Sequence, residues 1–266
     1  MTATYAARDT ATMLRRNLRH MQRYPGVPSM LVLLPVMFLL LFVYVFGATL
    51  GNGLGRLGGG RGVYVNYVSP AVILLTVASS STATAIGVAT DMTEGIIDRF
   101  RTMAIWRPSV LAGHVLGSMI QTLLSVAVVI GVALLVGFRP TAGALGWLAT
   151  VGFLAMITVA LTWLGVALGV VAKTVGTASN TPMFLILLVF LGSGFVPTAS
   201  MPTGLRQFAT YQPFTALTGT VHGLLTSGPI GDHALVSAAW CAGIAVAGYL
   251  WAVARYNRGP AAAPAQ

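Results

Sequence analysis

The chain has 266 residues, of which 56% are hydrophobic and only 8% are charged. Soluble globular domains carry charge on about a quarter of their residues, so this composition excludes a soluble globule and indicates an integral membrane protein. The formal net charge of +10 comes from arginines scattered between apolar runs, without the aromatic-interleaved basic patch typical of nucleic-acid binding. A single cysteine, Cys241, excludes a disulfide framework and a cysteine metal site. Arginine far outnumbers lysine, and Ala and Gly are abundant, which favours a protein of the bacterial plasma membrane.

Residues 1–26 are predicted to form a cytoplasmic arm that contains an amphipathic interfacial helix. Between residues 8 and 24 the arm is strongly basic, and Leu14, Leu18 and Met21 recur at helical spacing. This pattern is typical of a helix lying along lipid head groups. The residues expected at the membrane surface are Arg15, Arg16, Leu18 and Arg19. A cleaved signal peptide is the alternative, but the apolar run that follows is too long and no A-x-A site closes it.

Long uncharged gaps between charged residues predict an all-α integral membrane protein with six transmembrane helices. Each gap can hold the ~20 residues that a helix needs to cross ~30 Å of hydrocarbon. The predicted spans are residues 29–50, 67–90, 109–136, 145–171, 179–197 and 234–254. They make residues 27–254 one transmembrane domain, followed by a disordered cytoplasmic tail at residues 255–266. Pro35 and Pro182 are expected to kink their helices.

The distribution of basic residues predicts the orientation of these spans. Six crossings place both termini on one side, and that side carries most of the Lys and Arg. By the positive-inside rule, both termini and the connection between the second and third spans are cytoplasmic. The Gly-rich connection at residues 51–62 is then a flexible external loop.

The charged segment at residues 90–108 is predicted to form a short cytoplasmic helix with two different faces. The apolar face comprises Met92, Ile96, Phe100 and Met103, and the charged face comprises Glu94, Asp98 and Arg101. We expect Asp91 to cap the start, with Glu94 in the first turn, and Pro108 to stop the helix. Carrying its charges to the bilayer centre would cost roughly 3 kcal/mol each, so the helix must lie outside the lipid, where it can dock on a partner.

Residues 206–232 form a further uncharged segment, but they are not predicted to cross the membrane. The best apolar run, Phe214 to Leu225, has only about twelve residues, a length that suits an external re-entrant or interfacial hairpin between the fifth and sixth spans. A seventh crossing is the alternative, and it would place Arg255 and Arg258 outside the cell.

The sequence offers no nucleotide or metal site. The nearest phosphate-loop candidate, GVVAKT at residues 169–174, has Ala172 where the loop requires Gly, and it follows an apolar helix instead of a strand. Any ATP chemistry must therefore belong to another polypeptide, and this chain is not expected to be an enzyme. The histidines, which lack the spacing of a metal site, are His20, His114, His222 and His233. We interpret His114 as interfacial or packed against a neighbouring helix.

Small polar residues gather in the middle of the second predicted span. One interpretation is close helix packing through small side chains, and the other is a path for the transported substrate. The residues of the second interpretation are Ser79, Ser80, Thr82 and Thr84. An ion-coupled carrier usually keeps ionisable groups at mid-membrane depth, and the chain has only poor candidates for such groups.

Three motifs stand out in chain order: EGIIDRFRTM at residues 94–103, FVPTASMP at residues 195–202 and YQPFTAL at residues 211–217. Together with the basic arm, this layout resembles the membrane permease of type-2 ATP-binding-cassette exporters, closest to the daunorubicin-resistance type of drug-export permease. The resemblance covers nearly the whole chain. One departure is Ala104, because the family usually has proline directly after the methionine.

The resemblance implies a coupling helix at residues 94–103 that docks into a groove on a separate ATPase subunit. Its contact residues would be Glu94, Gly95, Ile96, Asp98, Arg99, Phe100 and Arg101. The resemblance also implies a second permease subunit, identical or paralogous, and an external gate at the hairpin. The gate residues would be Pro197, Tyr211, Pro213, Phe214 and His222.

The expected function is that of the permease subunit in an ATP-driven exporter of amphiphilic drug-like compounds or lipids. An exporter of cell-surface polysaccharide or glycolipid has the same architecture and is the first alternative. A secondary, ion-coupled carrier is the second alternative, and its transport would be indifferent to ATP. The expected partners are the ATPase, a second permease subunit and membrane lipids, with no nucleic acid and no cofactor bound by this chain.

Overall fold

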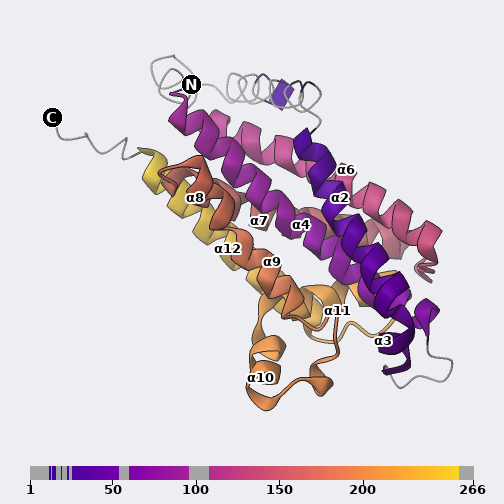
Figure 1. The fold of residues 1–266 in the computed structure, drawn as a ribbon. Helices are drawn as coiled ribbons and strands as arrows, with labels where there is room; N and C mark the ends of the chain where they lie inside the picture. The colour runs from indigo at the N-terminus through magenta and orange to yellow at the C-terminus, as the bar shows by residue number, and fades with distance from the viewer. Residues whose placement is uncertain are drawn as a thin grey trace.

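The computed structural model describes residues 26–53, 60–95 and 108–257, together with Thr12, Leu14, Arg15, Arg19 and Arg23. For residues 27, 28, 53, 108–111, 256 and 257 it describes the backbone only. Within this part of the chain every regular element is a helix, which confirms the predicted all-α class. Figure 1 shows the long helices side by side in an inclined bundle.

The first long element is a continuous helical rod made of three parts. α2 (Gly26–Leu41) is followed without a break by the π-helical stretch η1 (Phe42–Phe46) and by α3 (Gly47–Gly53). Pro35 lies inside α2, which continues through it. The rod is fixed to a distant part of the chain by aromatic packing, because the ring centroids of Phe42 and Phe195 are 4.8 Å apart.

The other long helices are α4 (Arg61–Thr93), α6 (Pro108–Val136), α7 (Ala144–Val171) and α12 (His233–Asn257). In the described residues, five helical stretches are long and apolar enough to cross a membrane: Ser29–Asn52, Arg61–Thr93, Ala112–Val136, Ala144–Val171 and His233–Arg255. They correspond to five of the predicted spans, and they make the chain a multi-pass membrane protein. Because α12 continues to Asn257, the first residues of the predicted tail are helical.

The predicted span at residues 179–197 is a shorter, interrupted helix in the structure. α8 (Val175–Asn180) and α9 (Met183–Phe190) are separated by a turn at Pro182, which has no N–H to donate. This interruption agrees with the expected kink. The apolar stretch Val175–Phe190 is shorter than the ~20 residues of a full helical crossing. Figure 1 shows α8 and α9 following each other along the bundle, and a total of six crossings stays a prediction.

The described residues of the N-terminal arm are helical. Arg15, Arg19 and Arg23 are exposed, and Leu14 is partly buried. Arg16 and Leu18 lie outside the described residues. The amphipathic helix at the membrane surface therefore stays a prediction.

α4 forms the centre of the bundle. Every residue from Ala71 to Ser81 is buried, and α4 contacts α2, α6, α7, α9 and α11. A helix that is apolar around most of its circumference can be buried on all sides. Glycine brings α7 close to it, since a β-carbon added at Gly165 would lie 2.6 Å from the carbonyl oxygen of Ser81. Small residues at such contacts allow the close backbone packing that associates helices in lipid.

The two ends of the bundle carry different elements. We call one end the Thr93 end; it holds the last turn of α4, the start of α6 and the end of α12 (Figure 1). We call the other the hairpin end; it holds the start of α4 and the segment between α9 and α12. The predicted orientation makes the Thr93 end cytoplasmic.

Three short helices form the hairpin: η2 (Thr198–Ser200), α10 (Thr203–Tyr211) and α11 (Pro213–Thr226). α11 lies across the end of the bundle. Just before it, the amide nitrogen of Gln212 donates to the carbonyl oxygen of Leu188 in α9 at 2.9 Å. Near its end, the carbonyl oxygen of Leu225 accepts from the N–H of Thr141, before α7, at 3.0 Å. α11 includes the apolar run recognised in the sequence, and its 14 residues are fewer than a crossing needs.

Candidate functional site

At the Thr93 end, α4 is longer than the sequence predicted. It runs through Asp91 to Thr93, and the N–H of Glu94 still donates to the carbonyl oxygen of Thr90 at 2.9 Å. The expectation that Asp91 caps the start of the next helix is therefore wrong. The left-handed conformation that commonly ends a helix occurs at Gly95, four residues after Asp91, where φ is 68°. Glu94 is exposed in this turn.

Only the first two residues of the predicted docking segment belong to the described part of the chain. Glu94 and Gly95 form the turn that follows α4. The remaining predicted contact residues lie outside the described residues: Ile96, Asp98, Arg99, Phe100 and Arg101. Their helix, its two faces and its role in docking stay predictions.

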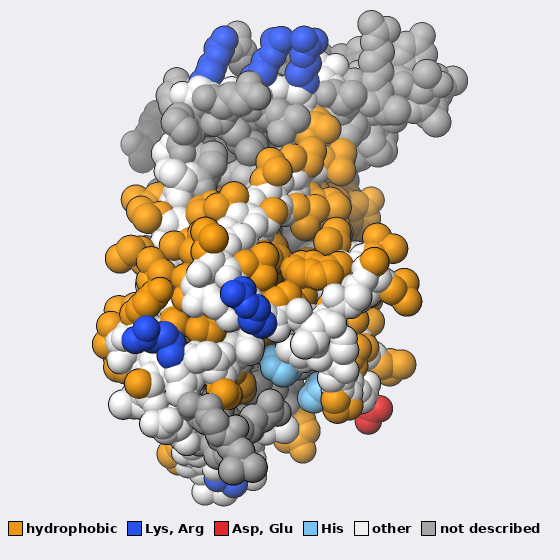
Figure 2. All heavy atoms as spheres, turned by 90° about the vertical axis from the view of Figure 1, so that its right-hand side faces the viewer, with side chains coloured by type: hydrophobic (Ala, Val, Ile, Leu, Met, Phe, Trp, Pro, Cys, Tyr) orange, Lys and Arg blue, Asp and Glu red, His pale blue; other side chains and the backbone are white. Residues whose placement is uncertain are grey.

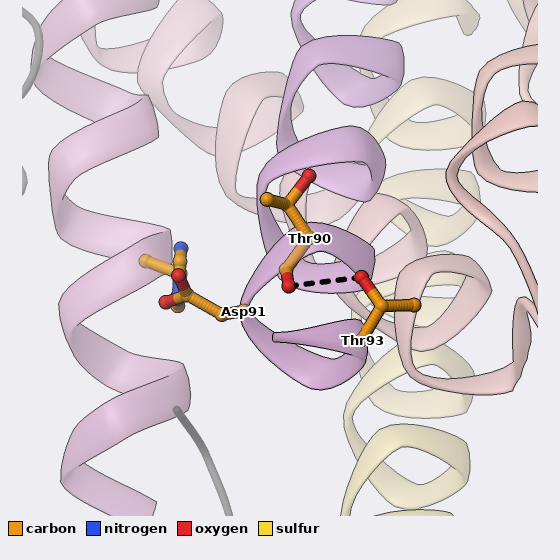
Figure 3. A network of polar contacts seen from close by, with 4 residues as sticks. Thr90, Asp91 and Thr93 are labelled. Atoms are coloured by element: carbon orange, nitrogen blue, oxygen red, sulfur yellow. Dashed lines mark hydrogen bonds and ion pairs between the residues drawn. The ribbon is translucent and has the colours of Figure 1, made fainter. Parts of the chain in front are cut away.

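A buried polar pair joins α4 to α6 directly behind this turn. Nε2 of His114 lies 3.0 Å from Oδ2 of Asp91, and the two side chains are only 11% and 10% exposed. Figure 3 shows Asp91 reaching from α4 toward the neighbouring helix, while the Thr93 hydroxyl donates to the carbonyl oxygen of Thr90. A buried carboxylate is costly unless a donor such as an imidazole N–H satisfies it. The pair therefore holds the end of α4 against the start of α6.

Sequence reasoning missed this pair because it assigned Asp91 to the loop helix. Its second interpretation of His114, packing against a neighbouring helix, agrees with the structure. A signal was available in the sequence. Both residues lie within about two turns of the same connection, and an ionisable side chain at that depth in a span usually has a named partner.

The small polar residues of α4 are enclosed within the subunit. Ser79 and Ser80 each donate to a carbonyl oxygen about one turn earlier, at 2.8 and 2.7 Å. The Thr84 hydroxyl donates to the carbonyl oxygen of Ser80 and lies 2.9 Å from Oγ of Ser118 in α6. The hydroxyl oxygen of Thr82 is buried without a hydrogen-bond partner among the described residues. These contacts favour close packing, and a substrate path along these residues stays a prediction.

The predicted gate residues are divided between surface, core and a hollow. Tyr211 is 81% exposed at the end of α10, whereas Phe214 is 2% exposed inside the core. Pro213 is the first residue of α11. Pro197 and His222 lie together, because both line a hollow at the hairpin end.

This hollow has a volume of about 630 Å³ and lies between α4, α11 and the turns after α9. Small-molecule sites typically occupy ~300–1,000 Å³. Figure 2 shows histidine side chains close together on the lower part of one face, with Lys or Arg side chains above them. The residues that line the hollow are Val63, Asn66, Tyr67, Ser193, Pro197, Thr198, Ala199, Thr218, Gly219, His222, Pro229 and His233. Because these residues come from distant segments, most of them could not be recognised as neighbours from the sequence.

The phosphate-loop candidate at residues 169–174 is the C-terminal end of α7 followed by a turn. No strand precedes it in the described part of the chain. Across residues 26–53, 60–95 and 108–257, no group of three or more His, Cys, Asp or Glu could hold a metal ion.

The amino-acid sequence of this chain matches a known protein family and several known proteins. Residues 8–225 match the family model described as ABC-2 type transporter. The daunorubicin resistance ABC transporter permease protein DrrB1 of Streptomyces coeruleorubidus is 30% identical over 238 residues, which cover 88% of this chain and 82% of that protein. The probable doxorubicin resistance ABC transporter permease protein DrrC of Mycobacterium tuberculosis is 23% identical over 215 residues, with 81% and 76% covered. The family match extends from the N-terminal arm to the end of α11, and the chain therefore belongs to the ABC-2 type transporter family.

Proposed function

We propose that this chain is the permease subunit of an ATP-driven exporter and that a separate ATPase subunit docks at the Thr93 end. The observation that carries the proposal is the family match over residues 8–225, which includes the whole connection between α4 and α6. The relatives are named as permease proteins. In this proposal ATP and Mg²⁺ bind to the partner, and residues 94–103 form its docking helix.

The geometry behind the docking segment supports this role. Asp91 and His114 join α4 and α6 within a few residues of the connection, so a displacement of the connection acts on both helices. α4 in turn is buried along most of its length. A closely packed interior transmits displacement because it has little free volume to absorb it. Movement of the docking segment would therefore reach the hairpin end through α4.

The proposed cargo is an amphiphilic drug-like compound or a lipid, moved outward. The names of the relatives refer to resistance to daunorubicin and doxorubicin, both amphiphilic aromatic compounds. The proposal includes a second permease subunit, identical or paralogous. Three helical stretches leave most of their surface open to lipid or to such a subunit, with only 28%, 28% and 22% of their apolar windows buried: Ser29–Asn52, Ala112–Val136 and His233–Arg255.

Docking can be tested with the permease and its ATPase reconstituted together in vesicles. We expect Phe100→Ala and Asp98→Arg to lower cargo transport about tenfold or more, since truncating a central anchor of an interface commonly costs more than 1.4 kcal/mol. ATP hydrolysis should continue, because the catalytic site lies in the partner. Lys173→Glu is the matched control: it reverses an exposed charge in the connection between α7 and α8 and should leave transport unchanged.

Normal transport in both docking variants would refute docking through residues 94–103. Transport that continues without ATP and stops with a protonophore would instead establish a secondary carrier. A soluble ATPase encoded beside this chain would supply the partner needed for the assay.

A further inference from the structure

The hollow at the hairpin end is built by contacts between segments that are remote in sequence. The Tyr67 hydroxyl donates to the carbonyl oxygen of Ser193, which joins α4 to the turn after α9. On the opposite wall, Gly219 leaves room for the ring of His233, because a β-carbon at Gly219 would lie 3.2 Å from Cδ2 of that ring. The hollow is therefore a defined space between several elements, rather than a groove along one helix.

One guanidinium, that of Arg206, is bonded to the lining of the hollow, and two further arginines are linked to lining residues only through the backbone. The backbone N–H of Arg139 donates to Oδ1 of Asn66 at 2.9 Å, and Nη2 of Arg206 donates to the carbonyl oxygen of Ala199 at 2.9 Å. Arg61 lies two residues before Val63 in the first turn of α4, where its guanidinium stacks 4.8 Å above the ring centroid of Tyr44. Asn66, Ala199 and Val63 all line the hollow.

Carboxylates are scarce at the same end. In the described residues, Asp232 is the one acidic side chain at the hairpin end; it is exposed in the turn before α12 and is not among the lining residues. The lining instead includes His222 and His233. A concave surface with low-dielectric walls focuses the field of nearby charges, and the charged group bonded to this lining, the guanidinium of Arg206, is positive.

The hydrogen-bonding groups favour the same kind of ligand. Because Oδ1 of Asn66 already accepts from Arg139, the amide nitrogen of Asn66 is the end that remains, and it can only donate. The imidazole ring of His233 can add a donor to the lining, while Val63, Pro197 and Pro229 add apolar surface. A ligand with an acceptor-rich negative group attached to an apolar body matches both parts.

We propose that this hollow binds the anionic head group, a phosphate or carboxylate, of an amphiphile. The proposed binding is inferred from the geometry of the hollow alone. The further role of the hollow as a release site for cargo rests on the proposed exporter function. A cationic amphiphile such as doxorubicin would find no carboxylate among the lining residues to pair with and would lie near the guanidinium of Arg206, so the site selects against it. The amphiphilic cargo of the proposed exporter would then be anionic and would differ in charge from the drugs that appear in the names of the relatives.

The test measures binding of fluorescent lysophosphatidylglycerol to the full-length permease in phosphatidylcholine nanodiscs, without the ATPase and without ATP. Asn66→Asp keeps the oxygen that accepts from Arg139 but adds a negative charge to the lining, and we expect about tenfold weaker binding. His233→Glu adds the charge from the opposite wall at an exposed position and should have the same effect if the first variant does not assemble. Asn52→Asp, the same change at an exposed position outside the lining, should bind like the wild type.

Three further ligands define the chemistry. Lysophosphatidylcholine and doxorubicin should bind the wild type at least about tenfold more weakly, and inorganic phosphate should compete poorly because it lacks the apolar body. Equal binding of lysophosphatidylglycerol to the wild type and both acidic variants overturns the proposal, as does tighter binding of doxorubicin. If inorganic phosphate competes at the same concentration as the lysolipid, the hollow is a site for free anions. That result would overturn the proposal that it binds an amphiphile. Since no ATP is used, these results do not depend on the docking experiment.

Discussion

Asp91 and His114 show how one contact between distant residues changes the meaning of a local sequence pattern. An Asp followed three residues later by Glu is a common start of a helix, but here α4 continues past it. The carboxylate is accommodated inside the span because His114 of α6 lies 3.0 Å from it. Local capping preferences cannot anticipate a partner that is 23 residues away.

This pair should contribute to the stability of the Thr93 end. We expect His114→Ala to destabilise the fold by about 3 kcal/mol, because removing one partner of a buried pair leaves the other charge poorly compensated. Asp91→Asn in the same background should recover part of this loss, since it removes that charge. Thermal unfolding in detergent, followed by near-ultraviolet circular dichroism, measures both changes. Additive effects of the two substitutions would show that the contact carries no coupling energy.

At the level of elements, the close contact between α4 and α7 also depends on residues that are far apart in the sequence. A β-carbon at Gly165 would lie 2.6 Å from a carbonyl oxygen of α4, and one at Gly169 would also lie 2.6 Å from a carbonyl oxygen of α4. Backbone atoms cannot move aside as flexible side chains can. The sequence interpretation of close packing through small residues is therefore supported where α7 meets α4, and the glycines of α7 are its counterpart.

Substitution of these glycines separates packing from helix propensity. We expect Gly165→Ala to destabilise the protein by about 1–3 kcal/mol, because the added methyl group forces the two backbones apart. Gly152→Ala in the same helix has no atom within 4 Å of the added carbon and should be neutral or stabilising by up to about 1 kcal/mol. The midpoints of thermal unfolding compare the two variants directly. Equal loss in both would show that glycine is needed in α7 for another reason.

The long helices were predictable from charge alone, and the interrupted one was not. The predicted span at residues 145–171 differs from α7 by one residue, because charged residues are costly in lipid and the gaps between them mark the helices. Around Pro182 the sequence stays uncharged while the backbone leaves the helix, so a count of charges could not locate that end. The hollow was least predictable, since α4, α11 and the turn at Ser193 meet there only through tertiary packing.

For the whole molecule, the asymmetry of the two ends predicts which residues face the outside of the cell. Thr203 at the start of α10 and Thr177 in α8 are both exposed, at opposite ends of the bundle. In a Cys241→Ser background, Thr203→Cys should react with a membrane-impermeant maleimide added to intact cells, and Thr177→Cys should react only after lysis. The reverse pattern would invert the orientation and place residues 94–103 outside.

The length of α4 has a consequence for how the permease operates. Its 33 residues extend about 50 Å, well beyond the ~30 Å of hydrocarbon, so one unbroken rod carries Asp91 near one tip and Asn66 with Tyr67 near the other. The helix continues through Pro70, so both groups of residues belong to one element. In the proposed exporter, tilting or sliding α4 at the Thr93 end would therefore displace Asn66 and Tyr67, which line the hollow at the hairpin end.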